Sequence, residues 1–473
     1  MRSHRVFLAV TLLAVACGGS SARPGEAPDS GSPGSHPGSG SGSGPGGGSA
    51  EGGPGSPAGC SSSLSSGFSA VPVSFTVPAA RCQASFQEAA ADGPITYDTL
   101  ALTGGGHPDL VVYRDQCDPT VGQTHWDIYG WGASGFAVSP SPFTVPAPRC
   151  QTRFESAAQD SAVSYATSDL TGDGNADLVV FKDSCDATVG QSHWDVYAWG
   201  ATGFAAAPSA FFVPAPRCQT RFDQEAQDGA VSYATMDVTG DGHADLVVFK
   251  DSCDPTVGQT HWDVYAWGAS GFAATPTPFT VPAPRCQTSF DGAAQDGSVS
   301  YATMDLTGDG HVDLVVFQDS CDPTVGHTHW DTYGWSASGF APAPTAFAVP
   351  APRCQTDFNE AAQDGAVSYS TIDVTGDGHP DLVVVQDSCD MTVGQTHWDV
   401  YPWSSSGFAP APATFGLPAP RCQTSFDAVA QDGSVSYAAM RLADACSTNL
   451  VVFQDSCDTT VGATHWEVYE QAR

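Results

Sequence analysis

The stretch MDVTGDGHADLVVF, residues 236–249, recurs along the chain, and its copies indicate the fold. Its first half brings the oxygen-bearing side chains of Asp237, Thr239, Asp241 and Asp245 into one short loop, with glycines that permit a sharp turn. Carboxylates this close repel one another unless a cation lies among them, and hard oxygen ligands at this spacing suit Ca²⁺. The apolar run that follows predicts a buried strand. The stretch therefore predicts a calcium-holding turn between two strands.

A helix-loop-helix calcium site is excluded, because such a site needs Glu at its twelfth position and Val248 stands there. Four intact copies of the loop begin at aspartates spaced 68 residues apart, and we expect about four structural Ca²⁺ ions, one in each copy. His243 and its counterparts are expected to contribute only their backbone carbonyls. The predicted metal-site residues are Asp169, Thr171, Asp173, Asn175, Asp177, Asp237, Thr239, Asp241, His243, Asp245, Asp305, Thr307, Asp309, His311, Asp313, Asp373, Thr375, Asp377, His379 and Asp381.

The same 68-residue interval separates twelve of the cysteines, so the chain consists of six near-identical units. The loops of the outer two units have decayed. Ala101 and Gly105 replace two of the aspartates in the first unit. Arg441, Ala445 and Asn449 replace all three in the last unit.

The composition is strongly acidic, with a formal net charge of −35 and only two lysines, Lys182 and Lys250. Nucleic-acid binding is therefore not expected, because a phosphate backbone would meet a repelling surface. Four bound Ca²⁺ ions would offset eight of the negative charges. The remaining charge is expected to keep the protein soluble and monomeric.

Residues 1–17 are predicted to be a lipoprotein-type signal peptide, with a basic start and a short apolar core. The run LAVAC, which ends at Cys17, resembles a bacterial lipoprotein cleavage box and implies that Cys17 is lipidated. The alternative is an ordinary secretion signal with an incidental cysteine. Residues 18–59 are rich in Gly, Ser and Pro and predict a disordered tether. We therefore expect an exported lipoprotein at the outer membrane or cell surface of a bacterium, whose N-terminal lipid is its only membrane contact.

One unit predicts four strands and no helix. Its strands are expected at 231–238, 245–249, 261–267 and 272–281, with a hairpin turn between the last two. Prolines place the fourth strand at a sheet edge. Four strands per unit are typical of a propeller blade, so residues 60–473 predict an all-β, six-bladed β-propeller of four-stranded blades.

The ends of the domain predict a closed ring. The last unit stops after its third strand, 465–469, while residues 66–78 match 270–282 in register. The N-terminal strand is therefore expected to complete the sixth blade, which removes the open sheet edges of a linear array.

The pattern Asp-x-Thr-Gly-Asp-Gly-x-x-Asp-Leu-Val-Val resembles the FG-GAP or VCBS repeat, and the resemblance covers all six units. That family forms calcium-binding β-propellers, including the integrin α-subunit head and several fungal lectins. The resemblance implies ligand binding at a cell surface. The chain departs from the family in its two cysteines per unit and its two decayed loops, and the family often closes seven blades.

Setting Cys17 aside leaves fourteen cysteines, an even number that implies disulfides in an exported protein. In a blade, the loop before the first strand and the loop between the second and third strands lie on one ring face, and each unit has a cysteine in both. Pairing within units leaves Cys60 and Cys446, which we expect to lie together on the opposite face. The rival pairing joins successive units, such as Cys253 with Cys286. It ranks second because it leaves Cys82 and Cys457 unpaired. The predicted disulfides are Cys82–Cys117, Cys150–Cys185, Cys218–Cys253, Cys286–Cys321, Cys354–Cys389, Cys422–Cys457 and Cys60–Cys446.

The sequence THWD, residues 260–263, occurs in similar form six times. Its His and Asp point to the same face of a strand and could serve acid–base chemistry, but an enzyme usually assembles one site. The chain shows no phosphate-binding loop, nucleophile elbow or metal-hydrolase motif. We therefore expect no catalytic residues and no enzymatic activity.

Two sets of tryptophans repeat along the chain. Trp262 and its counterparts are expected to pack between blades. The second set lies near the hairpin turn, where it either packs under the turn, which we favour, or forms a platform for sugar. The candidate ligand-binding tryptophans are Trp199, Trp267, Trp335 and Trp403.

These features predict a binding or adhesion module for a surface glycan or protein. Two other classes stay open. A purely structural surface protein would show no saturable ligand, and a propeller hydrolase or lyase would show turnover at a cleft that is not repeated.

Overall fold

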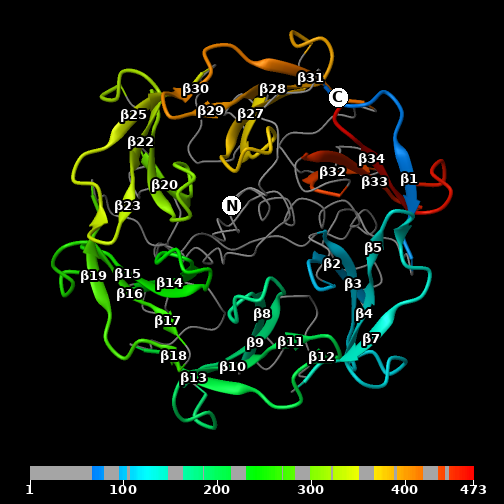
Figure 1. Cartoon of the computed structure of the whole chain (residues 1–473), viewed down its shortest axis with the longest axis horizontal. Coiled ribbons are helices and arrows are strands. Elements are labelled where there is room, and N and C mark those ends of the chain that lie inside the picture. The colour runs from blue at the N-terminus through cyan, green and yellow to red at the C-terminus, as the bar shows by residue number, and fades with distance from the viewer. Residues whose placement is uncertain are drawn as a thin grey trace, which may run out of the picture.

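Six four-stranded antiparallel sheets stand around a common axis, and their first strands lie nearest to it (Figure 1). The computed structural model of the chain describes residues 67–78, 95–103, 107–146, 163–184, 186–214, 231–268, 270–282, 299–320, 323–350, 367–387, 391–418, 435–442, 447–456 and 458–472. The all-β, six-bladed propeller predicted from the repeat is therefore confirmed.

The third blade shows the common plan. Its sheet has the order β14 (Val231–Met236), β15 (Asp245–Lys250), β16 (His261–Tyr265) and β19 (Thr277–Thr280), and a small hairpin, β17 (Trp267–Gly268) with β18 (Gly271–Phe272), precedes β19. The other strands are β1 (Val73–Thr76), β2 (Ile95–Leu100), β3 (Asp109–Arg114), β4 (His125–Tyr129), β5 (Trp131–Gly132), β6 (Gly135–Phe136), β7 (Ser141–Thr144), β8 (Val163–Ser168), β9 (Asp177–Lys182), β10 (His193–Tyr197), β11 (Trp199–Gly200), β12 (Gly203–Phe204), β13 (Ser209–Phe212), β20 (Val299–Met304), β21 (Asp313–Gln318), β22 (His329–Tyr333), β23 (Trp335–Ser336), β24 (Gly339–Phe340), β25 (Thr345–Ala348), β26 (Val367–Ile372), β27 (Asp381–Gln386), β28 (His397–Tyr401), β29 (Trp403–Ser404), β30 (Gly407–Phe408), β31 (Ala413–Gly416), β32 (Val435–Met440), β33 (Asn449–Gln454) and β34 (His465–Tyr469).

The connection between the third and fourth strands differs from the prediction. The third strand ends at Tyr265 rather than at residue 267, because the backbone N–H of Trp267 donates to the Asp245 carboxylate at 2.8 Å and the chain turns there into the hairpin. Gly271 closes this hairpin with a φ of +94°, a left-handed conformation that favours glycine. The fourth strand therefore begins only at Thr277.

The second strand of each blade is apolar on both faces because neighbouring blades cover both sides. In β15, Leu246 and Val248 pack in a cluster with β9 and β10 of the second blade, whereas Val247 and Phe249 pack with β20 and β21 of the fourth. The continuous apolar run thus belongs to two successive cores, and this arrangement accounts for its lack of polar alternation.

Each interface between blades also contains a cluster of aromatic rings. Between the third and fourth blades, Trp335 meets Phe279 and Phe340 edge-on, with ring centroids 4.5 and 4.8 Å apart. Trp262 meets Phe340 at 4.7 Å. Such edge-to-face pairs stabilise beyond the area they bury. Trp262 and its five counterparts are all buried, as expected from the sequence.

The ring closes as predicted. β1 pairs antiparallel with β34, which places the first strand of the chain on the outside of the sixth blade (Figure 1). Phe68 forms a bridge with Gln471, and the N–H of Ala472 donates to the Gly67 carbonyl at 2.8 Å. These contacts rebuild, from the two ends of the chain, the hairpin that the other blades form continuously.

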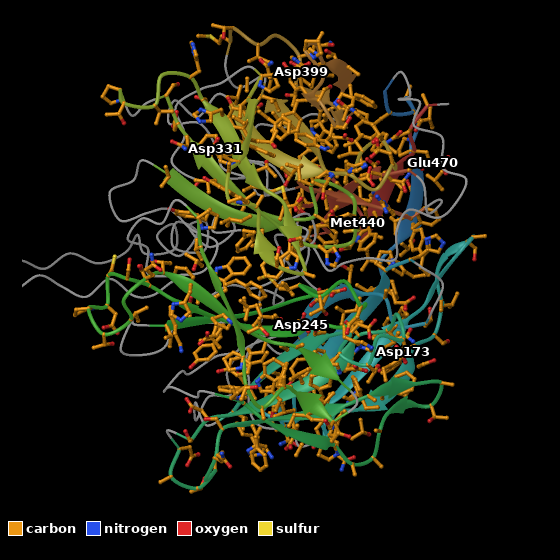
Figure 2. The ribbon with its side chains drawn as sticks, turned by 60° about the vertical axis from the view of Figure 1, so that its left-hand side comes forward. Asp173, Asp245, Asp331, Asp399, Met440 and Glu470 are labelled. Carbon is orange, nitrogen blue, oxygen red and sulfur yellow. The ribbon has the colours of Figure 1, made fainter. Side chains whose placement is uncertain are left out.

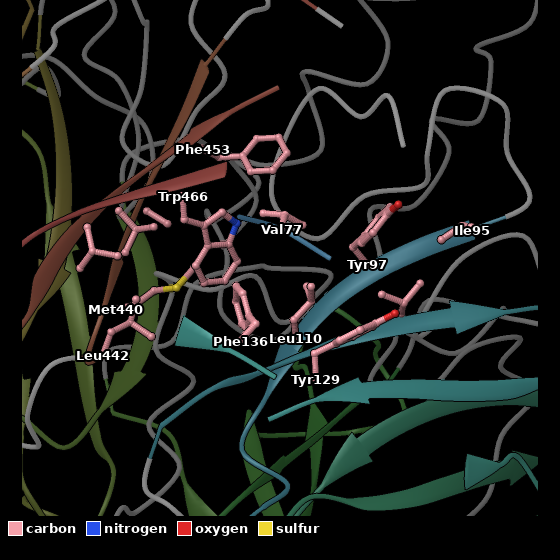
Figure 3. Close-up of a cluster of buried hydrophobic side chains, with 14 residues drawn as sticks. Val77, Ile95, Tyr97, Leu110, Tyr129, Phe136, Met440, Leu442, Phe453 and Trp466 are labelled. Atoms are coloured by element: carbon pink, nitrogen blue, oxygen red, sulfur yellow. The ribbon is translucent and has the colours of Figure 1, made fainter. Parts of the chain in front are cut away.

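The closing interface is packed like the others. In Figure 3, Trp466 lies next to Met440 of its own, sixth blade and Phe136 of the first blade. The Trp466 and Phe136 centroids are 4.7 Å apart. The seam between the two ends is therefore a complete hydrophobic core.

Candidate metal-binding loops and polar turn face

The aspartate loops connect the first and second strands, and we name each by its first aspartate. In the Asp237 loop, one carboxylate oxygen of Asp237 accepts from the N–H groups of Gly240 at 2.6 Å and Asp241 at 3.2 Å. The other oxygen accepts from Gly242 at 2.8 Å. The loops headed by Asp169, Asp305 and Asp373 repeat this pattern. The side chain of the first aspartate thus stabilises the loop conformation by accepting hydrogen bonds from the backbone N–H groups of the loop.

The last aspartate of each loop is fully buried and joins three segments of the blade. Asp245 accepts from the N–H groups of Val238 at 3.1 Å and Thr239 at 3.0 Å through one oxygen. Its other oxygen accepts from Trp267 at 2.8 Å. Asp177, Asp313 and Asp381 have the same three donors. Asp173 and Asp245, in neighbouring loops, are labelled in Figure 2.

The pKa values of these buried carboxylates are raised above the ordinary value of an aspartate. Burial raises the pKa of Asp245 to about 6, the backbone N–H donors lower it, and the charges of Asp241 and Asp237 raise it further. The same causes raise the pKa of Asp313 to about 6 and that of Asp381 to about 7. Burial is therefore the main cause of the raised pKa values, and the neighbouring loop carboxylates add to it.

Among the described residues, no three or more His, Cys, Asp or Glu side chains are grouped closely enough to hold a metal ion. In each intact loop, the first and last carboxylates are instead oriented toward backbone amides. A carboxylate oxygen has two lone pairs, so an amide bond does not exhaust its capacity as a ligand. The metal role of the twenty residues named from the sequence stays a prediction.

The loop histidines contact the preceding blade. His243 Nδ1 lies 3.2 Å from the Leu170 carbonyl oxygen, and a side chain at Gly172 would place its Cβ 2.4 Å from His243 Cε1. His311 and His379 make the same contacts with Val238 and Leu306, and with Gly240 and Gly308. The histidine side chains thus connect successive loops, and the glycines leave room for them.

The two decayed loops carry less negative charge, and their described residues keep some of the hydrogen bonds of the intact loops. Asp109 still accepts from Leu102, Thr103 and Trp131, as Asp245 does in its own loop. In the sixth blade, Asn449 accepts from the Leu442 N–H at 2.9 Å. Arg441, at the first position of that loop, donates from Nη2 to Asp373 Oδ2 at 2.5 Å.

The second set of tryptophans is packed. Trp199, Trp335 and Trp403 are only 6–7% exposed, and Trp267 is half-buried. Trp199 meets Phe143 and Phe204 edge-on, and its Nε1–H donates to the Leu102 carbonyl at 2.7 Å. The observed contacts favour the packing interpretation over the sugar platform.

The His–Asp pairs of the third strands lie at ion-pair distance. His261 Nε2 is 3.7 Å from Asp263, and Lys250 Nζ is 2.6 Å from the same carboxylate. His261 Nδ1 also lies 2.7 Å from the Gln259 carbonyl oxygen. The counterparts of Lys250 are Arg114 and Lys182 in the first two blades and Gln318, Gln386 and Gln454 in the last three. The pair is structurally satisfied in every blade.

The turns between the second and third strands are exposed and alike, and together they form what we call the turn face. Because successive strands are antiparallel, this face is opposite to the aspartate loops. In the turns of the first, second, third and sixth blades, one carboxylate braces the next residues: Asp254 Oδ1 accepts from both the N–H and the hydroxyl of Thr256 at 2.8 Å. Gly258 has a φ of +85°, and its five counterparts lie between 84° and 86°. This face was not predicted from the sequence, although the recurring TVG motif, residues 256–258 in the third unit, was its signal.

The cysteines are described only in part. Cys117 and Cys253 are disulfide-bonded, and the partners predicted for them lie outside the described residues. Cys17 and the segment 18–59 also lie outside the described residues. Within the described part of the chain, no helix is long and apolar enough to cross a membrane.

Comparisons with known proteins add little to this geometry. No family model matches the chain, and no curated protein matches it. Among solved structures, the chain is similar to one described as "Structure of Dos1 propeller", at 10% sequence identity and a TM-score of 0.26, over 79% of this chain and 68% of that chain. A TM-score this low carries no argument, so the β-propeller assignment rests on the strand pairing described above.

Proposed function

We propose that the protein is an exported, lipid-anchored, calcium-binding propeller of the FG-GAP or VCBS type that binds a surface glycan. The observation that carries the binding role is the turn face. Six turns share a glycine whose φ lies between 84° and 86°, and the described residues around it are exposed in the same order. Repeated weak contacts to a clustered ligand gain from the high effective concentration of the later contacts.

The chemistry of the turn face favours an uncharged polar ligand. Thr256 and Gln259 are exposed in the third blade. The Gln259 amide offers both donors and an acceptor, whereas the Thr256 hydroxyl donates its proton to Asp254 and offers an acceptor. The formal net charge of −35 disfavours anionic ligands such as nucleic acids. Glycan hydroxyls meet both conditions, and a neutral peptide is the second candidate. We propose no catalytic role, because the His–carboxylate pair of the third strand repeats in every blade, as His–Asp in five blades and as His465–Glu467 in the sixth.

Calcium has a structural role in this proposal. The buried carboxylate of each intact loop lies among further negative charges that raise its pKa, and Asp, Thr and carbonyl oxygens are the donors that Ca²⁺ prefers. A bound Ca²⁺ would neutralise this charge and stabilise the native ring by mass action. The loops lie opposite the turn face, so the ion is not expected to contact the ligand.

The test is a glycan-array screen of the purified protein with and without Ca²⁺. The binding variant replaces the exposed glutamines of four turns by alanine. These are Gln123, Gln191, Gln259 and Gln395. The matched control replaces four exposed hydroxyl residues at the hairpin tips of the opposite face, Thr202, Ser270, Ser338 and Ser406. We expect the first variant to lose avidity and the second to keep it. Binding to no glycan and no peptide would favour the structural class, and turnover of a bound glycan would favour the enzyme class.

A further inference from the structure

Arg441 of the sixth blade places a positive charge beside the Asp373 loop of the fifth blade. It stands at the first position of the sixth blade's loop, where the intact loops have aspartate. Its guanidinium Nη2 lies 2.5 Å from Asp373 Oδ2, and the Asp373 side chain is 14% exposed. That oxygen also accepts from the Gly378 N–H at 2.9 Å. The first aspartate of the fifth blade's loop is therefore already paired with a cation.

The contacts between the sixth blade and the Asp373 loop differ from the contacts that the other loops make with the next blade. At the preceding interfaces, a histidine ring of the next blade approaches the loop. Here Thr448 donates its hydroxyl to the Asp373 carbonyl at 2.7 Å, and Gln471 donates to the Val374 carbonyl at 2.9 Å. The other Lys and Arg ion pairs within the described ranges involve third-strand aspartates, not loops.

We propose that the Arg441 guanidinium takes the place of an ion in the Asp373 loop, so that the protein binds Ca²⁺ in three loops, headed by Asp169, Asp237 and Asp305. The inference rests on the calcium role proposed above and corrects its count. A divalent ion in the Asp373 loop would have to displace the guanidinium from Asp373 or lie beside it, and like charges at such a distance repel.

The assignment divides the ring into two parts. The fifth, sixth and first blades, where the chain ends meet, are held without an ion, whereas the second, third and fourth blades depend on calcium. The closing seam therefore stays formed when calcium is removed. An internal cation between the fifth and sixth blades has a clear advantage over a bound ion, because it cannot dissociate.

The experiment counts Ca²⁺ by equilibrium dialysis of the full chain and compares two matched variants. Asp305→Asn removes the first aspartate of a loop that we assign to calcium, and we expect the count to fall from three to two. Asp373→Asn makes the same change in the fifth blade, and we expect the count to stay at three. Arg441→Gln should raise the count to four. Arg114→Gln, which removes an Arg–Asp pair outside the aspartate loops, should leave it at three.

The outcomes separate this inference from the calcium proposal. A wild-type count of four, or a loss of one ion in Asp373→Asn, overturns the assignment of Arg441 and leaves the calcium role intact. A wild-type count of zero overturns both. A melting measurement in chelator gives a second readout: Arg441→Gln should lower the melting temperature, and added Ca²⁺ should restore it. An unchanged melting temperature in chelator would contradict the role of Arg441 between the fifth and sixth blades.

Discussion

Replacing Trp199 by alanine separates the packing role of the hairpin tryptophans from a ligand role. The indole is 7% exposed, meets Phe143 and Phe204 edge-on at 4.7 and 4.9 Å, and donates to the Leu102 carbonyl at 2.7 Å. Truncating a buried tryptophan to alanine typically costs about 3–5 kcal/mol, from lost transfer free energy and the cavity left behind. We expect Trp199→Ala to lower the free energy of unfolding by about 4 kcal/mol.

A second variant isolates the hydrogen bond. Trp199→Phe keeps an aromatic ring against Phe143 and Phe204 but removes the donor to the buried Leu102 carbonyl. An unpaired buried acceptor costs about 1–3 kcal/mol, so we expect a loss of about 2 kcal/mol, smaller than that of the alanine variant.

The assay is urea unfolding followed by far-ultraviolet circular dichroism, run beside glycan binding. A Trp199→Ala protein that loses less than about 1 kcal/mol of stability but no longer binds ligand would refute the packing role. That result would restore the tryptophan to the binding site. A large loss of stability with binding retained under native conditions would support the packing interpretation.

Three further predictions follow from the described contacts. Non-reducing peptide mapping should recover Cys253 linked to Cys218, and a link from Cys253 to the next unit would contradict the pairing within units. Burial raises the pKa of Asp381 to about 7, so between about pH 4 and pH 7 the native state binds a proton that the unfolded state does not. In chelator, the contribution of this proton to the free energy of unfolding is therefore complete below about pH 4 and is lost as the pH rises through about 7. Asp381→Asn should flatten this fall in urea titrations at successive pH values, and an unchanged slope would reject the assignment. Phe68→Ala and Phe136→Ala should each lower the free energy of unfolding by about 3 kcal/mol, because both phenylalanine side chains pack against a third-strand tryptophan. An effect of Phe136→Ala alone would show that the N-terminal segment does not close the propeller.

Much of the fold can be predicted from the sequence because the same pattern of strands and turns occurs in six units. The blade strands, the buried second strand and the match between residues 66–78 and 270–282 all follow from a period of 68 residues. A hairpin turn between the third and fourth strands was predicted, but the wider break that ends β16 at Tyr265 and begins β19 at Thr277 was not. It depends on the hydrogen bond from Trp267 to Asp245, which joins residues 22 positions apart, and no local pattern reports such a contact.

The number of blades, their order and the way in which the ring closes can be read from the amino-acid sequence, because hydrophobic period and register are properties of the chain. The roles of individual residues at the interfaces become visible only when the blades are packed together. Trp199 is buried because a neighbouring blade covers it, Asp245 is perturbed because burial removes its water, and Arg441 is paired because the ring brings Asp373 beside it. Each of these outcomes depends on contacts between blades, which a single repeat cannot reveal.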